Sequence, residues 1–170
     1  LMLAKLNVSY VIVGHSERRA MFGELDDRVN EKARAALAHG ITPIVAVGET
    51  AEEHAGGFAR DKVCAQVRAA FDGMPATRVG RCVVAYEPIW AIGTGHADSP
   101  SEANAIMGDI RSAVDGLAEC RLLYGGSMKP ENVRDFVQQP NIDGGLVGGA
   151  SLDPASFAAL LDGARRGVHA

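Results

Sequence analysis

Short apolar runs rich in β-branched residues alternate along the chain with longer segments of mixed polarity. Glycine or polar residues follow each run, which is typical of a strand that ends at a loop. Because the runs are nearly continuous rather than alternating, they indicate strands buried on both faces. We therefore predict strands at residues 10–13, 41–47, 82–86, 121–124 and 143–147.

The intervening segments carry apolar residues at helical spacing, bounded by helix signals. Asp26 or Asp27 is expected to cap a helix that stops at Gly40. The capping pattern from Ser99 to Glu102 predicts a helix that runs to about Leu117. Other helices are expected at 1–6, 58–71 and 130–137, and after Asp153. Their buried sides are predicted to hold Val29, Ala33, Ala36, Leu37, Val63, Val67, Phe71, Phe157, Leu160 and Leu161.

Strand followed by helix, repeated about five times, predicts a parallel sheet with helices outside it, in one domain spanning 1–170. Two architectures remain open. A doubly wound sheet needs roughly five or six strands, whereas a (β/α)₈ barrel usually takes more than ~200 residues. Polar and glycine clusters follow nearly every predicted strand, and a doubly wound sheet would gather its site at one switch point. This placement favours the barrel.

Composition narrows the classes of function. The chain has 170 residues, of which 47% are hydrophobic, and a formal net charge of −4. It has no basic stripe for nucleic acid and no apolar run near the roughly 20 residues of a membrane span. Three widely spaced cysteines, Cys64, Cys82 and Cys120, indicate reduced thiols in a cytosolic protein. The histidines show no ligand spacing, so we expect no metal.

The most informative stretch for chemistry is 82–95, in which Glu87 ends a buried strand and Pro88 directs the chain into a loop. That loop is apolar where a solvated loop would be polar, and Gly93 and Gly95 permit large backbone changes. Such a loop is typical of a lid that closes over a ligand. A carboxylate beneath a lid is a candidate general base, although a strand-end Glu can also be a helix cap or a surface charge.

Two glycine pairs follow the last two predicted strands, in the stretches 125–127 and 148–151. Each pair frees backbone N–H groups to point at one spot beside a hydroxyl, which suits a phosphate. One pair alone could be only a tight turn, but two at these positions match the phosphate site common in (β/α)₈ barrels. His15 is the other polar residue at a strand end. A single His is often structural, and its setting in 14–19 is what singles it out.

Several of these stretches resemble the triosephosphate isomerase family, in family order: 10–19, 22–24, 43–49, 85–95, 124–127 and 144–152. The resemblance implies a (β/α)₈ barrel, usually a homodimer. It also implies interconversion of dihydroxyacetone phosphate and glyceraldehyde 3-phosphate without a cofactor. Nucleic-acid and membrane partners are not expected.

The resemblance also implies roles for individual residues. Glu87 would move the proton between the two carbons of the substrate. His15 would be the neutral imidazole that polarises the carbonyl, and the triosephosphate isomerase family is itself the standard example of this arrangement. Glu17 would be a supporting carboxylate, and Arg18 would pair with Glu24. The phosphate would be held by Gly93, Ser127, Gly148 and Gly149. The lid would comprise Pro88, Ile89, Trp90, Ala91, Ile92, Gly93, Thr94, Gly95, His96 and Ala97.

The resemblance begins at the family's fourth strand, and the chain starts at Leu1, without the features of a signal peptide. We therefore expect an incomplete barrel that lacks the family's amino-terminal Asn and Lys and is inactive alone. Ala46 stands where the family usually has Cys, and His96 where it has Lys. One alternative is a non-catalytic fragment that serves for interaction or complementation. Another phosphate-binding barrel isomerase would leave the Glu87 lid and the His15 loop unexplained.

Overall fold

The computed structural model describes residues 2–93 and 98–168, and its centre is one sheet of five parallel strands. The strands lie in chain order, so each pairs with its neighbours in sequence: β1 (Tyr10–Val13), β2 (Thr42–Val47), β3 (Val83–Tyr86), β4 (Arg121–Tyr124) and β5 (Gly144–Gly145). A doubly wound sheet would reverse its order at a switch point. The unbroken order matches the wall of the predicted barrel.

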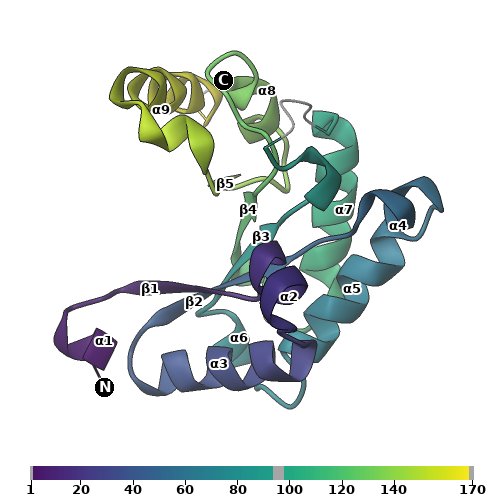
Figure 1. Ribbon diagram of the computed structural model, residues 1–170, viewed down its shortest axis with the longest axis vertical. Helices are drawn as coiled ribbons and strands as arrows, with labels where there is room; N and C mark the ends of the chain where they lie inside the picture. The colour runs from purple at the N-terminus through teal and green to yellow at the C-terminus, as the bar shows by residue number, and fades with distance from the viewer. Residues whose placement is uncertain (1, 94–97, 169–170) are drawn as a thin grey trace.

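Helices connect the strands and pack along one side of the sheet, as Figure 1 shows for α3, α5 and α7. The sheet and its helices form an open curve, with β1 at one end and β5 with α9 at the other. The α-helices are α1 (Met2–Lys5), α2 (Ser16–Phe22), α3 (Asp26–Ala38), α4 (Ala51–Ala55), α5 (Ala59–Ala70), α6 (Ala76–Val79), α7 (Pro100–Ala113), α8 (Val133–Val137) and α9 (Pro154–Val168). The 3₁₀ helices are η1 (Ile89–Ala91), η2 (Leu117–Glu119) and η3 (Gly149–Leu152).

The core lies between the sheet and these helices. Val45, Val84 and Leu122 from three neighbouring strands are buried, and the predicted stripe of α5 packs in the same cluster. Fully burying one side chain of this size contributes roughly 1.5–3 kcal/mol, so this layer fixes the position of the strand ends. No described helix is both long and apolar enough to cross a membrane.

Some predicted boundaries were wrong for local reasons. Leu25, rather than Asp26 or Asp27, is the N-cap of α3, and Asp26 instead pairs with Arg19. Helix α7 ends at Ala113, short of Leu117, because Val114 is extended and Gly116 has a positive φ of 96°.

Two further expectations at the carboxyl-terminal end were wrong. Strand β5 keeps only two residues of the predicted 143–147. On α9, Leu160 is buried but Leu161 is 48% exposed.

The predicted residues 143–147 still lie beside β4, since Leu146 N–H donates to the carbonyl of Tyr124. Three short helices, α2, α4 and α6, were missed because each has too few residues for a visible apolar period.

Candidate active site

The carboxyl ends of the strands surround one cavity of about 800 Å³. Eight of the predicted site residues line it, and they come from loops after four different strands. The cavity-lining members of the predicted set are His15, Glu17, Glu87, Ile92, Gly93, Ser127, Gly148 and Gly149. Because a parallel sheet brings its carboxyl ends to one edge, residues as far apart in sequence as His15 and Gly149 share this space.

Glu87 lies directly after β3 and is only 3% exposed. One carboxylate oxygen, Oε1, is 3.1 Å from Nε2 of His15, and the other accepts the backbone N–H of Ser16 at 3.0 Å. Burial raises the pKa of Glu87 above its usual range, while the His15 and Ser16 contacts oppose that rise. A base with a raised pKa holds a proton more readily after removing it, as reversible proton transfer requires.

The hydrogen bonds of His15 define which nitrogen carries its proton. Nδ1 accepts the backbone N–H of Glu17 at 3.3 Å, so that nitrogen serves as an acceptor at the start of α2. The remaining nitrogen, Nε2, then carries the hydrogen and points at Glu87. This tautomer gives the cavity an N–H donor beside its buried carboxylate.

A network of charged side chains supports the His15 loop from behind. Glu24 is 6% exposed and accepts Gly14 N–H at 3.0 Å, Arg18 Nε at 2.7 Å and the ammonium of Lys32. Burial alone would raise the pKa of Glu24, but the Lys32, Arg18 and Gly14 hydrogen bonds outweigh it and lower the pKa to about 2. Glu24 is therefore an anion that fixes the turn at Gly14.

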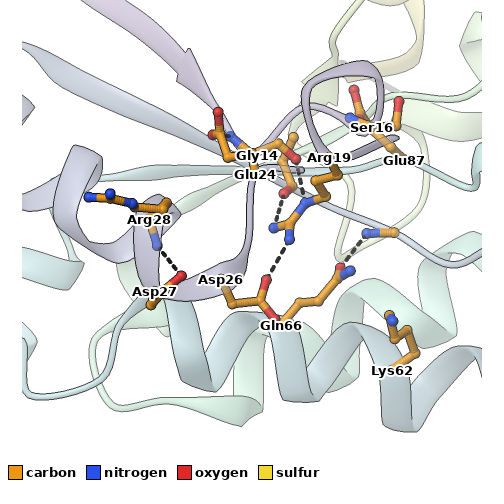
Figure 2. Close-up of polar contacts among 12 residues, drawn as sticks. Gly14, Ser16, Arg19, Glu24, Asp26, Asp27, Arg28, Lys62, Gln66 and Glu87 are labelled. Carbon is orange, nitrogen blue, oxygen red and sulfur yellow. Dashed lines mark hydrogen bonds and ion pairs between the residues drawn. The ribbon is translucent and has the colours of Figure 1, made fainter. Parts of the chain in front are cut away.

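Arg19 joins that turn to the neighbouring strand. Its Nε donates to the carbonyl of Gly14 at 2.6 Å and its Nη1 to Asp26 at 2.5 Å. Nη2 reaches the carbonyl of Ala46 in β2 at 3.3 Å. Figure 2 shows Arg19 extended from the Gly14 turn towards Asp26, with Glu87 and Ser16 on the other side of the loop. These hydrogen bonds of Arg19 fix the backbone at Gly14, the residue directly before His15.

The first part of the predicted lid follows Glu87 as a buried Pro88 and the 3₁₀ helix η1. Two contacts fix it. Trp90 Nε1 donates to Oε1 of Glu49 at 2.7 Å, and the Ser127 hydroxyl donates to the carbonyl of Ala91 at 2.8 Å. The predicted lid residues Thr94, Gly95, His96 and Ala97 lie outside the described residues.

The glycine pairs differ in what they do. A Cβ on Gly125 would lie 2.9 Å from Cγ of Glu87, and one on Gly126 would lie 2.3 Å from the Tyr124 hydroxyl oxygen. These two glycines therefore permit close packing around the Glu87 strand end. A Cβ on Gly148 or Gly149 would meet no atom within 4 Å, so their backbone faces open space at the cavity wall. The Gly125 N–H also donates to the carbonyl of Tyr86 at 2.7 Å, so of the two pairs the second is the one with open space beside its backbone.

Within the described ranges 2–93 and 98–168, no group of three or more His, Cys, Asp or Glu side chains is placed to hold a metal ion. The polar groups that line the cavity include the buried carboxylate of Glu87, the His15 imidazole and the Ser127 hydroxyl, together with the exposed charged side chains of Glu17, Lys129, Glu131 and Asp153.

Comparison with known proteins agrees with this arrangement. The family model for triosephosphate isomerase matches residues 1–164. The chain belongs to the triosephosphate isomerase family. A triosephosphate isomerase of Roseiflexus castenholzii (strain DSM 13941 / HLO8) is 52% identical over 167 residues, covering 94% of this chain and 65% of the relative. The chain thus spans less than two thirds of that relative's length. The fold is accordingly the family's (β/α)₈ barrel, of which the chain supplies five parallel strands.

Three hydrogen bonds in this site were not predicted from the sequence. The Ser16 N–H donates to Glu87, and the Lys32 ammonium donates to Glu24. The Glu49 carboxylate accepts the indole N–H of Trp90. Glu49 alone had a usable signal, since it follows a predicted strand in the same way as Glu87 does. Ala46, which stands where the family usually has Cys, is fully buried, and its backbone carbonyl accepts a hydrogen bond from Arg19 Nη2.

Proposed function

We propose that this chain is the carboxyl-terminal portion of a triosephosphate isomerase, which interconverts dihydroxyacetone phosphate and glyceraldehyde 3-phosphate. The observation that carries the proposal is the pairing of Glu87 with the Nε2–H of His15 inside the cavity that Gly148 and Gly149 also line. The family relationship supplies the substrate class. A base and a donor 3.1 Å apart can act on adjacent atoms of one small substrate.

The chemistry requires one proton to leave a carbon beside a carbonyl and to return to the neighbouring carbon. Glu87 takes the proton and becomes the carboxylic acid, while the electron pair moves onto the carbonyl oxygen. His15 Nε2–H donates to that oxygen and stabilises the enediolate, and a proton then passes from the hydroxyl oxygen on the neighbouring carbon to the former carbonyl oxygen. Glu87 delivers its proton to the carbon that carried the carbonyl, and the electron pair left on the other oxygen forms the new carbonyl. In the present structure Nε2 of His15 lies 3.1 Å from Oε1 of Glu87, and the substrate oxygen takes the place beside Nε2 when it binds.

The phosphate belongs at the other end of the cavity. Gly148 and Gly149 present backbone next to open space, and Ser127 lines the same wall. Gly93 lies at the end of the described part of the lid with a positive φ of 69°, a conformation that favours glycine. Apolar lid residues such as Ile92 border the cavity and would keep water from the enediolate, which otherwise loses its phosphate.

The proposal extends to the whole protein. Strands β1 and β5 each pair on one side only among the described strands, and Tyr10 and Ile12 of β1 are 52% and 43% exposed. We propose that 1–170 is one incomplete domain and that further βα units close the barrel between these two strands. We also propose a cytosolic homodimer that needs no cofactor. The comparisons give no support to the alternative of a non-catalytic interaction module.

An assay of the two triose phosphates tests the function. A complete barrel containing this chain is expected to interconvert them, with or without prior dialysis against a chelator. The 170-residue chain alone, its length checked by intact mass at 17.8 kDa, is expected to turn over little or nothing. Loss of activity on chelation, or a complete barrel that is folded but inactive, would contradict the proposal. Turnover by the 170-residue chain would overturn the need for further units.

A further inference from the structure

Gln66 is a buried polar side chain of α5 that the proposed chemistry does not use. It is 5% exposed, and its side-chain oxygen Oε1 accepts the backbone N–H of Gly48 at 2.8 Å. In Figure 2 the Gln66 side chain extends away from its helix, and a dashed line marks this hydrogen bond. The bond therefore joins a helix on the outside of the sheet to the residue that directly follows β2.

Gly48 lies where the end of β2 meets the backbone of the proposed base. A Cβ on Gly48 would lie 1.8 Å from the carbonyl oxygen of Glu87 and 2.7 Å from its carbonyl carbon. The residues on either side of Gly48 bind the same segment. The carbonyl of Val47 accepts the Glu87 N–H at 2.7 Å, and that of Glu49 accepts the Ile89 N–H at 3.1 Å. Any displacement of Gly48 therefore displaces the backbone that carries the Glu87 carboxylate.

The Gly48 N–H needs an acceptor because it is buried. Gly48 lies beyond the last paired residues of β2 and β3, Val47 and Tyr86, and a side chain supplies the acceptor. Without that side-chain oxygen, the N–H would be left unpaired in the interior, which is costly. The end of β2 would then shift until the N–H found water or another acceptor.

We propose that Gln66 is a positioning residue for Glu87. By accepting the Gly48 N–H it fixes the end of β2, and through that end it fixes the backbone from which Glu87 reaches the substrate. Gln66 is not one of the described residues that line the cavity, so it acts only through Gly48. The effect on turnover rests on the proposed function, whereas the effect on the strand end does not.

Gln66→Leu in a complete barrel tests the effect on turnover, because leucine removes the acceptor and is as good a helix former. A small misplacement of a base slows the chemical step, so kcat with dihydroxyacetone phosphate is expected to fall about tenfold or more. KM, and inhibition by inorganic phosphate at the Gly148 and Gly149 end, are expected to stay within about twofold of native.

Two further variants and a second readout separate positioning from stability. Gln66→Glu keeps an accepting oxygen at the same reach and is expected to restore kcat to within about threefold of native. Gln138→Leu makes the same change at an exposed glutamine after α8 and is expected to leave kcat unchanged. Hydrogen exchange of the Glu87 N–H needs no substrate. In Gln66→Leu it is expected to be about tenfold or more faster, while the amides of β4 keep their native exchange.

A folded Gln66→Leu enzyme with native kcat, or with native exchange at Glu87, would overturn the proposal. So would an equal loss in KM or phosphate inhibition, or a Gln66→Glu enzyme as slow as Gln66→Leu. If Gln66→Leu does not fold, Gln66→Asn replaces it with the same expected results, because its amide is one methylene too short to reach Gly48. Failure of both to fold would also overturn the positioning role. A native complete barrel without turnover would instead contradict the isomerase proposal, and hydrogen exchange would still test the contact.

Discussion

Two buried carboxylates near the cavity, Glu87 and Glu24, have pKa values shifted in opposite directions. Burial prevails at Glu87 over the opposing effects of His15, the Ser16 N–H and hydroxyl, and Arg19, and its pKa rises. At Glu24 burial is outweighed by Lys32, Arg18 and Gly14, and its pKa falls to about 2. The two cations hydrogen-bonded to Glu24 decide the difference. Glu87 can exchange a proton, and Glu24 stays an anion that supports the loop.

Glu24→Gln tests this difference through stability. A carboxyl group with a lowered pKa stabilises the folded state above its ordinary pKa of 4.5, and that contribution is lost as the pH falls towards about 2. Because Arg18 and Lys32 are 48% and 44% exposed, solvent screening reduces the effect, and we expect a loss of ~2 kcal/mol at pH 7. Urea unfolding at pH 7, 5 and 3 should show the difference shrinking.

Glu31→Gln is the matched control for that experiment. Glu31 pairs with Arg28 on the surface, with side chains 63% and 66% exposed, so its loss should cost under about 0.5 kcal/mol at every pH. An equal effect of the two substitutions would mean that the Glu24 network contributes no more than a surface ion pair.

Sequence alone could locate Glu87 and His15, because a strand end marks where a polar side chain faces the carboxyl edge of a sheet. It could not locate their partners. Ser16 contributes a backbone N–H, for which residue type carries no signal, and Lys32 reaches Glu24 from a separate helix.

At the scale of elements, the end of β2 holds the end of β3 by direct backbone contact. Glu87 N–H donates to the carbonyl of Val47 at 2.7 Å, and Ile89 N–H to that of Glu49 at 3.1 Å. Gly48, between these two acceptors, lies so close that a Cβ there would be 1.8 Å from the carbonyl oxygen of Glu87. The backbone of the proposed base is therefore fixed by a glycine on the neighbouring strand.

Gly48→Ala should consequently displace the strand end. We expect a loss of about 3 kcal/mol in the free energy of unfolding, as for overpacking of a tight core, together with a fall in kcat/KM in the complete barrel. Gly80→Ala is the control, because its Cβ would meet its nearest atom at 3.5 Å, an ordinary contact. If the Gly48→Ala protein unfolds at the same urea concentration as the native protein, the backbone of Glu87 is not held rigidly against residue 48.

The strands and long helices could be predicted because their apolar periods extend over several turns or residues. The predicted ends of helices and strands were wrong where tertiary contacts set those ends. Asp26 or Asp27 was expected to cap α3, but both lie inside its first turn and Arg19 binds Asp26. Strand β5 consists of two glycines that form only a short ladder with β4. Ser99 acts as predicted and accepts the Glu102 N–H at 3.2 Å, a hydrogen bond between residues only three positions apart.

At the scale of the whole molecule, the account depends on loops from separate strands meeting at one cavity. His15 follows β1, Glu87 follows β3, Ser127 follows β4 and Gly148 follows β5. The parallel order of the sheet is what brings them together, and this order followed from the alternation of strand and helix. The further βα units needed to close the barrel lie between β5 and β1 in our proposal, so catalysis is a property of the complete barrel.

The most direct test is therefore kcat/KM of Glu87→Gln, measured with dihydroxyacetone phosphate in a complete barrel and compared with Glu52→Gln. Glutamine keeps the size and burial of residue 87 but cannot take up the proton, whereas Glu52 is an exposed glutamate of α4. We predict a loss of roughly 10³-fold or more for Glu87→Gln, and a change of less than about twofold for Glu52→Gln. A Glu87→Gln enzyme that is folded and within about tenfold of native kcat/KM would contradict the assignment of Glu87 as the proton-transferring base.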